Sequence, residues 1–412
     1  MTTLESRNGI EATKAEEFKL ALEYFGPLAE QGDAEAQYNL GRIYMEGRGV
    51  EPNDSEAVRL YEFAAEQGYA PAQNSLGAMY GLGQGVKQSD TEAARLYRLA
   101  ADQGDAAAQF NLGVMYRDGK GVKQSHAETV RLYELSADRG NDNAQFELGL
   151  MYANGQGIEQ SDTGAVRYFH LAAEQGHAVA QYNLSVMYSH GQGVERSDIE
   201  AVRFLRLAAD QGDEDALVDL GVRHLDGASV EQSNTEAVRL FRLAAEQGNA
   251  VAQYNLGLQY ARGQGVEKSD TEAVRLYELA ADQGNAGAQN NLGSMYLFGE
   301  GVEQSDIKAA RFFSIAAAQG NAHAQNNLGG MHREYRLAEH SDAEAVRFFR
   351  LAVDQGHAGA HCNLGTMYLN GRGVEQSDSE AVRLYQLAAD RGNVEAQGAL
   401  NMIRGEGRIP LP

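Results

Sequence analysis

The sequence predicts an all-α protein, a solenoid of tandem 36-residue helix–turn–helix repeats. The segments AEAQYNLGRIYMEGRGV, APAQNSLGAMYGLGQGV and AAAQFNLGVMYRDGKGV begin at residues 34, 70 and 106, so the pattern recurs every 36 residues without insertion. An alanine column runs from Ala36 to Ala396 and a leucine column from Leu40 to Leu400, both without exception. A fixed period of this length is typical of stacked helical units that share one continuous core.

The first helix of each repeat is predicted from its apolar spacing. In the first repeat, Ala36, Leu40 and Tyr44 follow an i, i+4, i+8 pattern, which places them on one face of a helix. Gly47 and Gly49 come next, and glycines recur at both positions in most later repeats. Because glycine readily takes the left-handed conformation that stops a helix, we expect the first helix to end there.

The second helix is predicted from a similar face and from a capping sequence. In the first repeat, Leu60 and Tyr61 belong to an apolar face within residues 57–65. In the next repeat, Ser-Asp-Thr-Glu precedes the helix, so Ser89 can cap it and Glu92 can reach back as a capping box. Neither helix could bury its apolar face alone, which favours stacking of successive repeats.

Together the two helices read A-x-A-Q-x-x-L-G-x-M-Y-x-x-G-x-G-V and E-A-V-R-L-Y-x-L-A-A-D-Q-G-N, which resembles the Sel-one-like repeat (SLR) family, a relative of the tetratricopeptide repeat. The resemblance gives ten full repeats in residues 33–392. Residues 1–32 form an N-terminal segment with a capping helix over residues 11–32, and residues 393–412 form a half-repeat cap and tail. Family members often carry tryptophan in the second helix, where this chain has leucine. The resemblance implies a right-handed α/α superhelical solenoid whose first helices line a concave groove, as in adaptor proteins.

Composition limits the classes of partner and compartment. The formal net charge of -23 is spread along the chain and opposes docking on nucleic acid. No apolar run approaches the roughly eighteen residues that a membrane span needs, and the N-terminus does not resemble a secretory signal. The single cysteine, Cys362, can form no internal disulfide. We therefore expect a monomeric, cytoplasmic protein with no membrane span; secretion by a signal-independent machine is the alternative.

The expected function is that of a non-catalytic protein–protein interaction scaffold or adaptor, which binds a peptide or protein segment in the concave groove. Asparagine recurs one residue before the core leucine, and Asn255, Asn291 and Asn327 occupy consecutive repeats. An amide both donates and accepts hydrogen bonds, so this row can bond the backbone of an extended peptide. The alternative is that the row only ties first helices together.

An arginine occupies one second-helix position in every full repeat, from Arg59 to Arg383. A ladder of this kind could bind acidic peptides. We interpret it as structural, because glutamate stands three residues earlier in most repeats and can pair with it along the helix.

Two repeats break the pattern without changing their length. In one, Leu217 replaces the glutamine, and Arg223 and His224 replace Met-Tyr. The other, around residue 331, differs more. Tyr335 and Leu337 replace the two turn glycines, and His332 replaces the usual tyrosine. We expect a locally changed turn, through either an extended first helix or a reshaped connection, in which His332, Tyr335 and Arg336 present a partner-contact surface distinct from the other repeats. Neutral change in a tolerant repeat is the alternative.

The sequence contains no complete catalytic or metal-binding motif. The residues His357, His361 and Cys362 could supply metal ligands, but no fourth ligand is evident, so we expect no metal and no cofactor. No G-x-S-x-G, H-E-x-x-H or phosphate-loop motif is present. The alternatives to a scaffold are a hydrolase acting on a cell-wall-related or β-lactam-like substrate, as some cysteine-rich relatives of the family suggest, and a self-assembling structural protein. The paired cysteines of those relatives are missing here.

Overall fold

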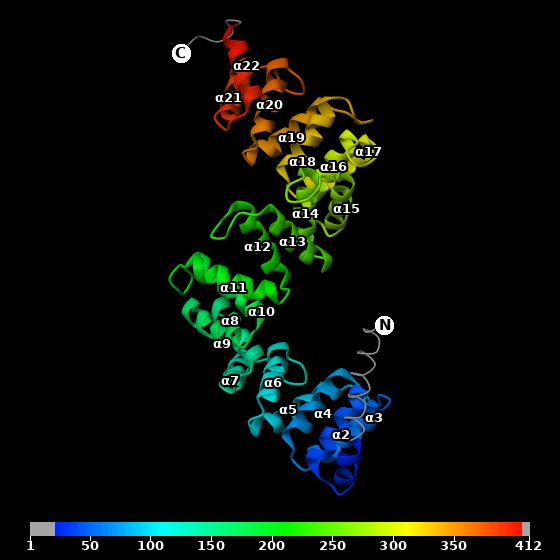
Figure 1. The fold of residues 1–412 in the computed structure, drawn as a ribbon. Helices are drawn as coiled ribbons and strands as arrows, with labels where there is room; N and C mark the ends of the chain where they lie inside the picture. The colour runs from blue at the N-terminus through cyan, green and yellow to red at the C-terminus, as the bar shows by residue number, and fades with distance from the viewer. Residues whose placement is uncertain (1–20, 406–412) are drawn as a thin grey trace. The chain divides into compact units, whose positions relative to one another are not determined.

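The computed structural model describes residues 21–405, which are helical throughout apart from the connecting turns and contain no strand. Figure 1 shows the helices following one another in pairs along the chain. The chain divides into two compact units, residues 1–208 and 209–412, with the boundary inside one helix. The predicted all-α solenoid of 36-residue repeats is confirmed. Within the described part of the chain, no helix is long and apolar enough to cross a membrane.

In the first unit, residues 21–30 are helical and precede the first repeat, while residues 11–20 of the expected capping helix lie outside the described residues. Even-numbered helices are the first helices of the repeats, and odd-numbered helices are the second. The helices are α2 (Ala34–Glu46), α3 (Asp54–Glu66), α4 (Ala70–Leu82), α5 (Asp90–Asp102), α6 (Ala106–Asp118), α7 (His126–Ala137), α8 (Asp142–Asn154), α9 (Asp162–Glu174), α10 (Ala178–His190) and α11 (Asp198–Asp210).

The second unit continues the same alternation and ends in a half-repeat, since α22 packs on α21 and no second helix follows it in the described residues. Its helices are α12 (Glu214–Asp226), α13 (Asn234–Glu246), α14 (Ala250–Arg262), α15 (Asp270–Asp282), α16 (Ala286–Phe298), α17 (Asp306–Ala318), α18 (Ala322–Arg333), α19 (Asp342–Asp354), α20 (Ala358–Asn370), α21 (Asp378–Ala389) and α22 (Val394–Gly405).

Both kinds of helix are capped as the sequence predicts, with one difference. The Asp105 carboxylate accepts the backbone N–H of Ala108 at 2.7 Å at the start of α6, and the Ser89 hydroxyl accepts that of Glu92 at 3.3 Å at the start of α5. The return bond of a capping box is not found for Glu92. Its carboxylate instead accepts a hydrogen bond from Arg95 at 2.8 Å, so the nearby guanidinium takes the place of the backbone donor.

In nine of the ten full repeats, the core depends on close packing between a glycine on the first helix and an aromatic ring on the second. A Cβ added at Gly329 in α18 would lie 2.7 Å from a ring carbon of Phe349 in α19. At Gly293 the equivalent ring is that of Phe313, again at 2.7 Å. Protein interiors have no spare volume at such contacts, so this glycine sets the separation of the paired helices.

Buried glutamines join successive repeats. The amide nitrogen of Gln73 in α4 donates to the Ala65 carbonyl of α3 at 3.1 Å, and its amide oxygen accepts from Gln103 at the end of α5 at 2.8 Å. Five other glutamines make the same pair of bonds: Gln37, Gln145, Gln253, Gln289 and Gln325. Each such amide therefore links one first helix to both second helices that flank it.

The second glycine of the turn is required for two reasons: its backbone has a positive φ, and it lies against the backbone of a neighbouring helix. Gly121 has a φ of 65°, and a Cβ added there would overlap the backbone carbonyl of Asp90 at the start of α5. Gly301 and Gly373 meet Asp270 and Asp342 in the same way. The turn of one repeat thus rests directly on the backbone of the preceding second helix.

Candidate functional site

The asparagine row lies on the first helices and makes contacts between repeats. The amide nitrogen of Asn327 in α18 donates to the side-chain oxygen of Asn290 in α16 at 3.1 Å. Asn363 donates to Asn326 in the same way at 2.8 Å. These bonds form where the preceding repeat offers asparagine at the neighbouring position, so part of the row ties first helices together.

The other two expected residues of the row are arranged differently. Asn291 accepts a hydrogen bond from the adjacent Asn290 at 3.3 Å. Asn255 in α14 is half-buried and makes no side-chain hydrogen bond to any residue that the structure describes. The structure places Asn255, Asn291 and Asn327 at equivalent positions of successive repeats, and brings Asn291 and Asn327 together only through Asn290.

The turn after α18 is reshaped, and the helix does not extend. Helix α18 ends at Arg333, one residue earlier than the first helices of the neighbouring repeats. Tyr335 has a φ of 59°, close to the 73° of Gly299 and the 64° of Gly371 at the same repeat position. Leu337 does not share the positive φ of Gly301. One left-handed residue is therefore retained in the turn and the other is lost.

Side chains of this turn are held by contacts with the neighbouring repeats. Tyr335 is 56% exposed, its ring lies edge-on to His340 at 4.5 Å, and the Arg372 guanidinium lies 5.2 Å from its centroid. Arg336 donates two hydrogen bonds to the Asp306 carboxylate, at 2.7 and 3.1 Å. This bidentate pair raises the pKa of Arg336 and fixes the turn to the start of α17.

His332 is placed inward from the other two residues of the expected surface. Its ring is half-buried and stacks on Phe348 with the centroids 5.7 Å apart. Burial lowers its pKa, and its Nδ1 has no hydrogen-bond partner among the described residues. Tyr335 is thus the exposed member of the set, while Arg336 and His332 are engaged with their own repeat stack.

The histidines near α20 form a hydrogen-bonded pair. The Nδ1 of His357 accepts the backbone N–H of Ala360 at 3.0 Å and so caps α20, which places the proton of the neutral ring on Nε2. That nitrogen lies 3.0 Å from Nδ1 of His323. Both ring nitrogens of His357 are therefore in use. Among the described residues, no group of three or more His, Cys, Asp or Glu side chains is arranged to hold a metal ion.

Protonation of His357 should cost stability, because a protonated ring cannot accept the Ala360 N–H. Burial, followed by the charges of His323 and His361, lowers the pKa of His357 below the usual histidine value of about 6.5. The neutral folded state is therefore fully stabilised above about pH 6.5, and stability is lost as the pH falls through the lowered folded pKa. In His357→Asn the new side chain can cap the helix without titrating, as Asn321 does in α18.

We expect the wild-type protein to lose about 0.5–1 kcal/mol more than His357→Asn between pH 7.5 and pH 5, measured by urea denaturation at both values. Carboxylates elsewhere titrate equally in the two proteins, so the difference isolates the histidine. Equal losses in both proteins would show that His357 does not couple to folding in this range.

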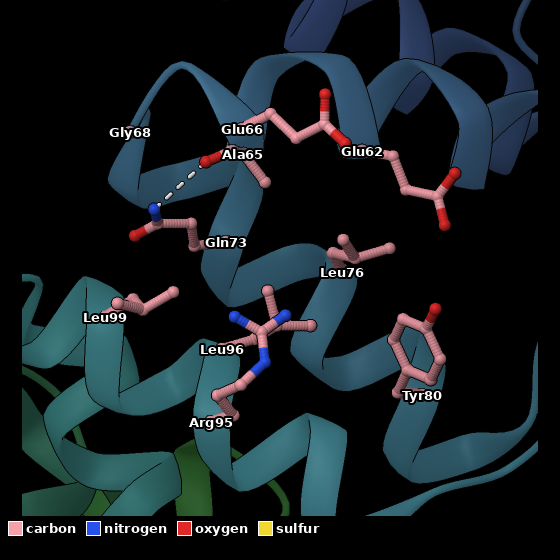
Figure 2. A pocket seen from close by; sticks show the side chains of 10 residues that line it. All are labelled: Glu62, Ala65, Glu66, Gly68, Gln73, Leu76, Tyr80, Arg95, Leu96 and Leu99. Atoms are coloured by element: carbon pink, nitrogen blue, oxygen red, sulfur yellow. Dashed lines mark hydrogen bonds between the residues drawn. The ribbon is translucent and has the colours of Figure 1, made fainter.

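A surface cleft of about 560 Å³ lies between α3 and α5, with α4 as its floor (Figure 2). Glu62 and Glu66 of α3 form one wall, and Leu96 and Leu99 of α5 form part of the other, beside Arg95. The cleft is open to solvent and combines an apolar base with charged walls, which suits a protruding side chain of a partner.

The same cleft recurs at the repeat period. A cleft of about 510 Å³ is lined by residues 36 positions earlier, among them Glu30, Arg59 and Phe63. In the second unit, a cleft of about 190 Å³ is lined by residues 180 positions later, including Glu246 and Leu279. The sequence analysis did not identify these clefts. The available signal was one large apolar residue per repeat, three residues after the leucine or aromatic residue that follows the arginine of the second helix.

The arginine row flanks these clefts and is neutralised along the helix in eight of the ten full repeats. Arg95 pairs with Glu92 at 2.8 Å and Arg275 pairs with Glu272 at 3.0 Å, both three residues apart. Equivalent pairs are made by Arg59, Arg131, Arg203, Arg239, Arg347 and Arg383. The structural interpretation of this row is confirmed.

Ten consecutive matches to the Sel1 repeat model cover residues 34–393. The chain is similar to a protective antigen from uropathogenic Escherichia coli that displays an SLR fold, with 37% identity over 94% of this chain and 83% of that one, and a TM-score of 0.86. A Sel1 repeat protein from Oxalobacter formigenes is 35% identical, covers 75% of this chain and 90% of its own, and has a TM-score of 0.56. No curated protein matches. On the matched repeats and the fold they build, the chain belongs to the Sel1 repeat family.

Proposed function

We propose that the protein is a non-catalytic scaffold or adaptor that binds a peptide or protein segment. The observation that carries this proposal is the recurrence of one solvent-open cleft at equivalent positions of several repeats. A single small molecule needs one site, whereas a row of equivalent clefts suits an elongated ligand that extends over several repeats. The fold of the family, which is typical of interaction scaffolds, supports the same function.

Two further surfaces are proposed to contribute. The first helices carry the asparagine row, in which Asn255 retains its full capacity to donate and accept, and Asn327 retains its amide oxygen. The turn after α18 presents Tyr335, an exposed aromatic side chain of the kind that anchors protein interfaces. We propose that the partner contacts the asparagine row with its backbone and that Tyr335 adds a contact specific to this repeat.

The test is affinity capture from lysate of the source organism, identification of the partner by mass spectrometry and calorimetric titration of the purified pair. We expect Asn255→Ala/Asn291→Ala to weaken binding by about tenfold, because two backbone contacts of about 0.5–1.5 kcal/mol each would be lost. Circular dichroism and thermal denaturation check that the fold is kept, because Asn255 makes no side-chain hydrogen bond to a described residue, whereas Asn291 interacts with the Tyr277 hydroxyl of the preceding repeat.

The matched control is Asn183→Ala in the first unit, where the amide nitrogen donates to the Val179 carbonyl of its own helix at 2.8 Å. It should bind the partner as the wild type does. Wild-type affinity in the double variant would assign the asparagine row to the architecture alone. Turnover of a captured small molecule, with no protein partner recovered, would overturn the scaffold proposal.

A further inference from the structure

Eight of the ten second helices expose one large apolar side chain at the same repeat position. Leu99 is 41% exposed, whereas its neighbour Leu96 is 3% exposed and belongs to the core. We call this set the apolar row; its members with exposures between 37% and 44% include Phe63, Leu99, Leu171, Leu243, Leu279, Ile315 and Leu351. Scattered exposed leucines need no explanation, but one at a fixed position in successive repeats forms a continuous feature of the surface.

The apolar row lines the clefts. Phe63, Leu99 and Leu279 each form part of the wall of one of the three clefts. In Figure 2, Leu99 and Leu96 lie on one side of the opening and Leu76 on the helix behind it. An apolar side chain that enters a cleft would therefore cover surface that the protein leaves exposed to water.

A carboxylate stands three residues after each member of the apolar row in nine of the ten full repeats. We call this set the acidic row: Glu66, Asp102, Asp138, Glu174, Asp210, Glu246, Asp282, Asp354 and Asp390. All nine are exposed, and none forms an ion pair with a residue that the structure describes. In the two clefts of the first unit, Arg95 and Arg59 are already paired with glutamates, so the uncompensated charge there is negative. In the third cleft, Arg242 offsets the charge of Glu246.

The acidic row is not explained by helix stability. Asp102, Glu174 and Asp282 are the last residues of α5, α9 and α15. A helix C-terminus carries a partial negative charge, so a carboxylate there is mildly destabilising, and these helices have no basic residue in the last turn. A charge that recurs where it disfavours the helix points to a use outside the helix.

We propose that the second-helix surface binds a polypeptide segment in which basic side chains stand next to apolar ones. The apolar side chains enter the clefts against the apolar row, and the lysines or arginines pair with the acidic row. This inference rests on the proposed scaffold function and names the chemistry of its partner. Each contact is weak, but a segment that engages several repeats gains from the linkage of equivalent sites. An acidic segment, a nucleic acid or an anionic lipid would be repelled.

One repeat interrupts the charge pattern and provides an internal control. In α17, Ala318 replaces the acidic residue, and Lys308 replaces the glutamate that pairs with the arginine in eight other repeats. The apolar member Ile315 is still present and 39% exposed. This repeat therefore keeps the apolar contact and lacks the carboxylate, so restoring the charge there should strengthen binding.

The test uses three synthetic, fluorescein-labelled peptides with the full-length chain, followed by anisotropy at physiological salt. One peptide carries Lys-Leu pairs separated by Gly-Ser, the second has Ser in place of every Leu, and the third has Glu in place of every Lys. We expect the Lys-Leu peptide to bind about tenfold more tightly than either of the others, because only it engages both rows.

Three variants test the acidic row with a matched control. Glu66→Gln/Asp102→Asn/Asp138→Asn should weaken binding of the Lys-Leu peptide about fivefold, without loss of thermal stability. Ala318→Glu should tighten it. The control, Glu51→Gln/Glu159→Gln/Glu195→Gln, removes the same total charge from exposed glutamates outside the row, and should leave affinity within about twofold of wild type.

Two results would overturn the proposal. Equal weakening by the control variant would mean that bulk charge, and not the acidic row, attracts the peptide. Equal binding of the Lys-Ser peptide would mean that the apolar row takes no part. Neither result bears on the proposed scaffold function. If a natural partner bound the wild type and the acidic-row variant equally well, the scaffold function would stand and the partner would contact another surface.

Discussion

Gly329→Ala is expected to lower the free energy of unfolding by about 1–3 kcal/mol, whereas Gly330→Ala, one residue along the same helix, should raise it by about 0.5–1 kcal/mol. At Gly329 the added methyl group would lie 2.7 and 2.8 Å from two ring carbons of Phe349, whose side chain is fully buried. At Gly330 nothing lies within 4 Å, so only the helix propensity changes. Urea denaturation followed by circular dichroism measures both.

In one repeat of this chain, a larger residue at the glycine position is accompanied by a smaller side chain opposite it. Ser185 stands at the same repeat position as Gly329, and the position of Phe349 is held by Leu205 in that repeat. Phe349→Leu should therefore recover part of the stability lost in Gly329→Ala when the two changes are combined, as expected for coupled neighbours. Strict additivity of the two changes, or equal effects of alanine at residues 329 and 330, would contradict the packing argument.

Gly121→Ala is expected to lower the free energy of unfolding by about 3 kcal/mol or more, and Gly140→Ala by only about 1–2 kcal/mol. Both glycines have positive φ, 65° and 85°, so both substitutions meet the same kind of conformational strain. Gly140 has open space around the position of an added Cβ, whereas Gly121 faces the backbone carbonyl of Asp90. The excess cost at Gly121 therefore measures the close approach of the turn to α5.

Thermal denaturation of the two variants tests this difference, and hydrogen exchange of the α5 and α6 amides localises it. Equal loss of stability at the two sites would show that conformation alone determines the cost and that the turn can move away from α5. A larger loss at Gly140 would contradict the packing seen in the structure.

Most of the fold can be predicted from the sequence because the same helix-forming and helix-ending signals recur from repeat to repeat. The spacing of Ala36, Leu40 and Tyr44 identifies one face of a helix, and the glycine at 47 marks its end. The structure confirms both, with α2 ending at Glu46 and Gly47 at a φ of 64°. In such a protein almost every contact is between neighbouring repeats, so periodicity defines the packing partners as well as the helices.

The candidate surfaces could be predicted only in part. Asn327 was identified, but its bond to Asn290 depends on which residue the preceding repeat presents 37 positions earlier. Arg336 was expected at an interface with a partner, and its bidentate pair with Asp306 could not be anticipated from adjacent residues. The clefts required knowledge of how three helices leave space between their side chains, which a one-dimensional pattern does not contain.

The chain of buried glutamines has a consequence for how the protein would respond to mechanical load. Its links are missing at three junctions. Arg139 replaces one donor, which leaves the amide oxygen of Gln109 unsatisfied, and Leu217 replaces one acceptor, so that Gln247 donates to the Gly212 carbonyl instead. At the third junction, His361 and Arg391 replace both partners. Junctions in a solenoid bear tension in series, and the weakest one gives way first. When the two ends of the chain are pulled apart, we therefore expect the junctions that lack this bond to separate first, while the fully bonded repeats between them stay folded.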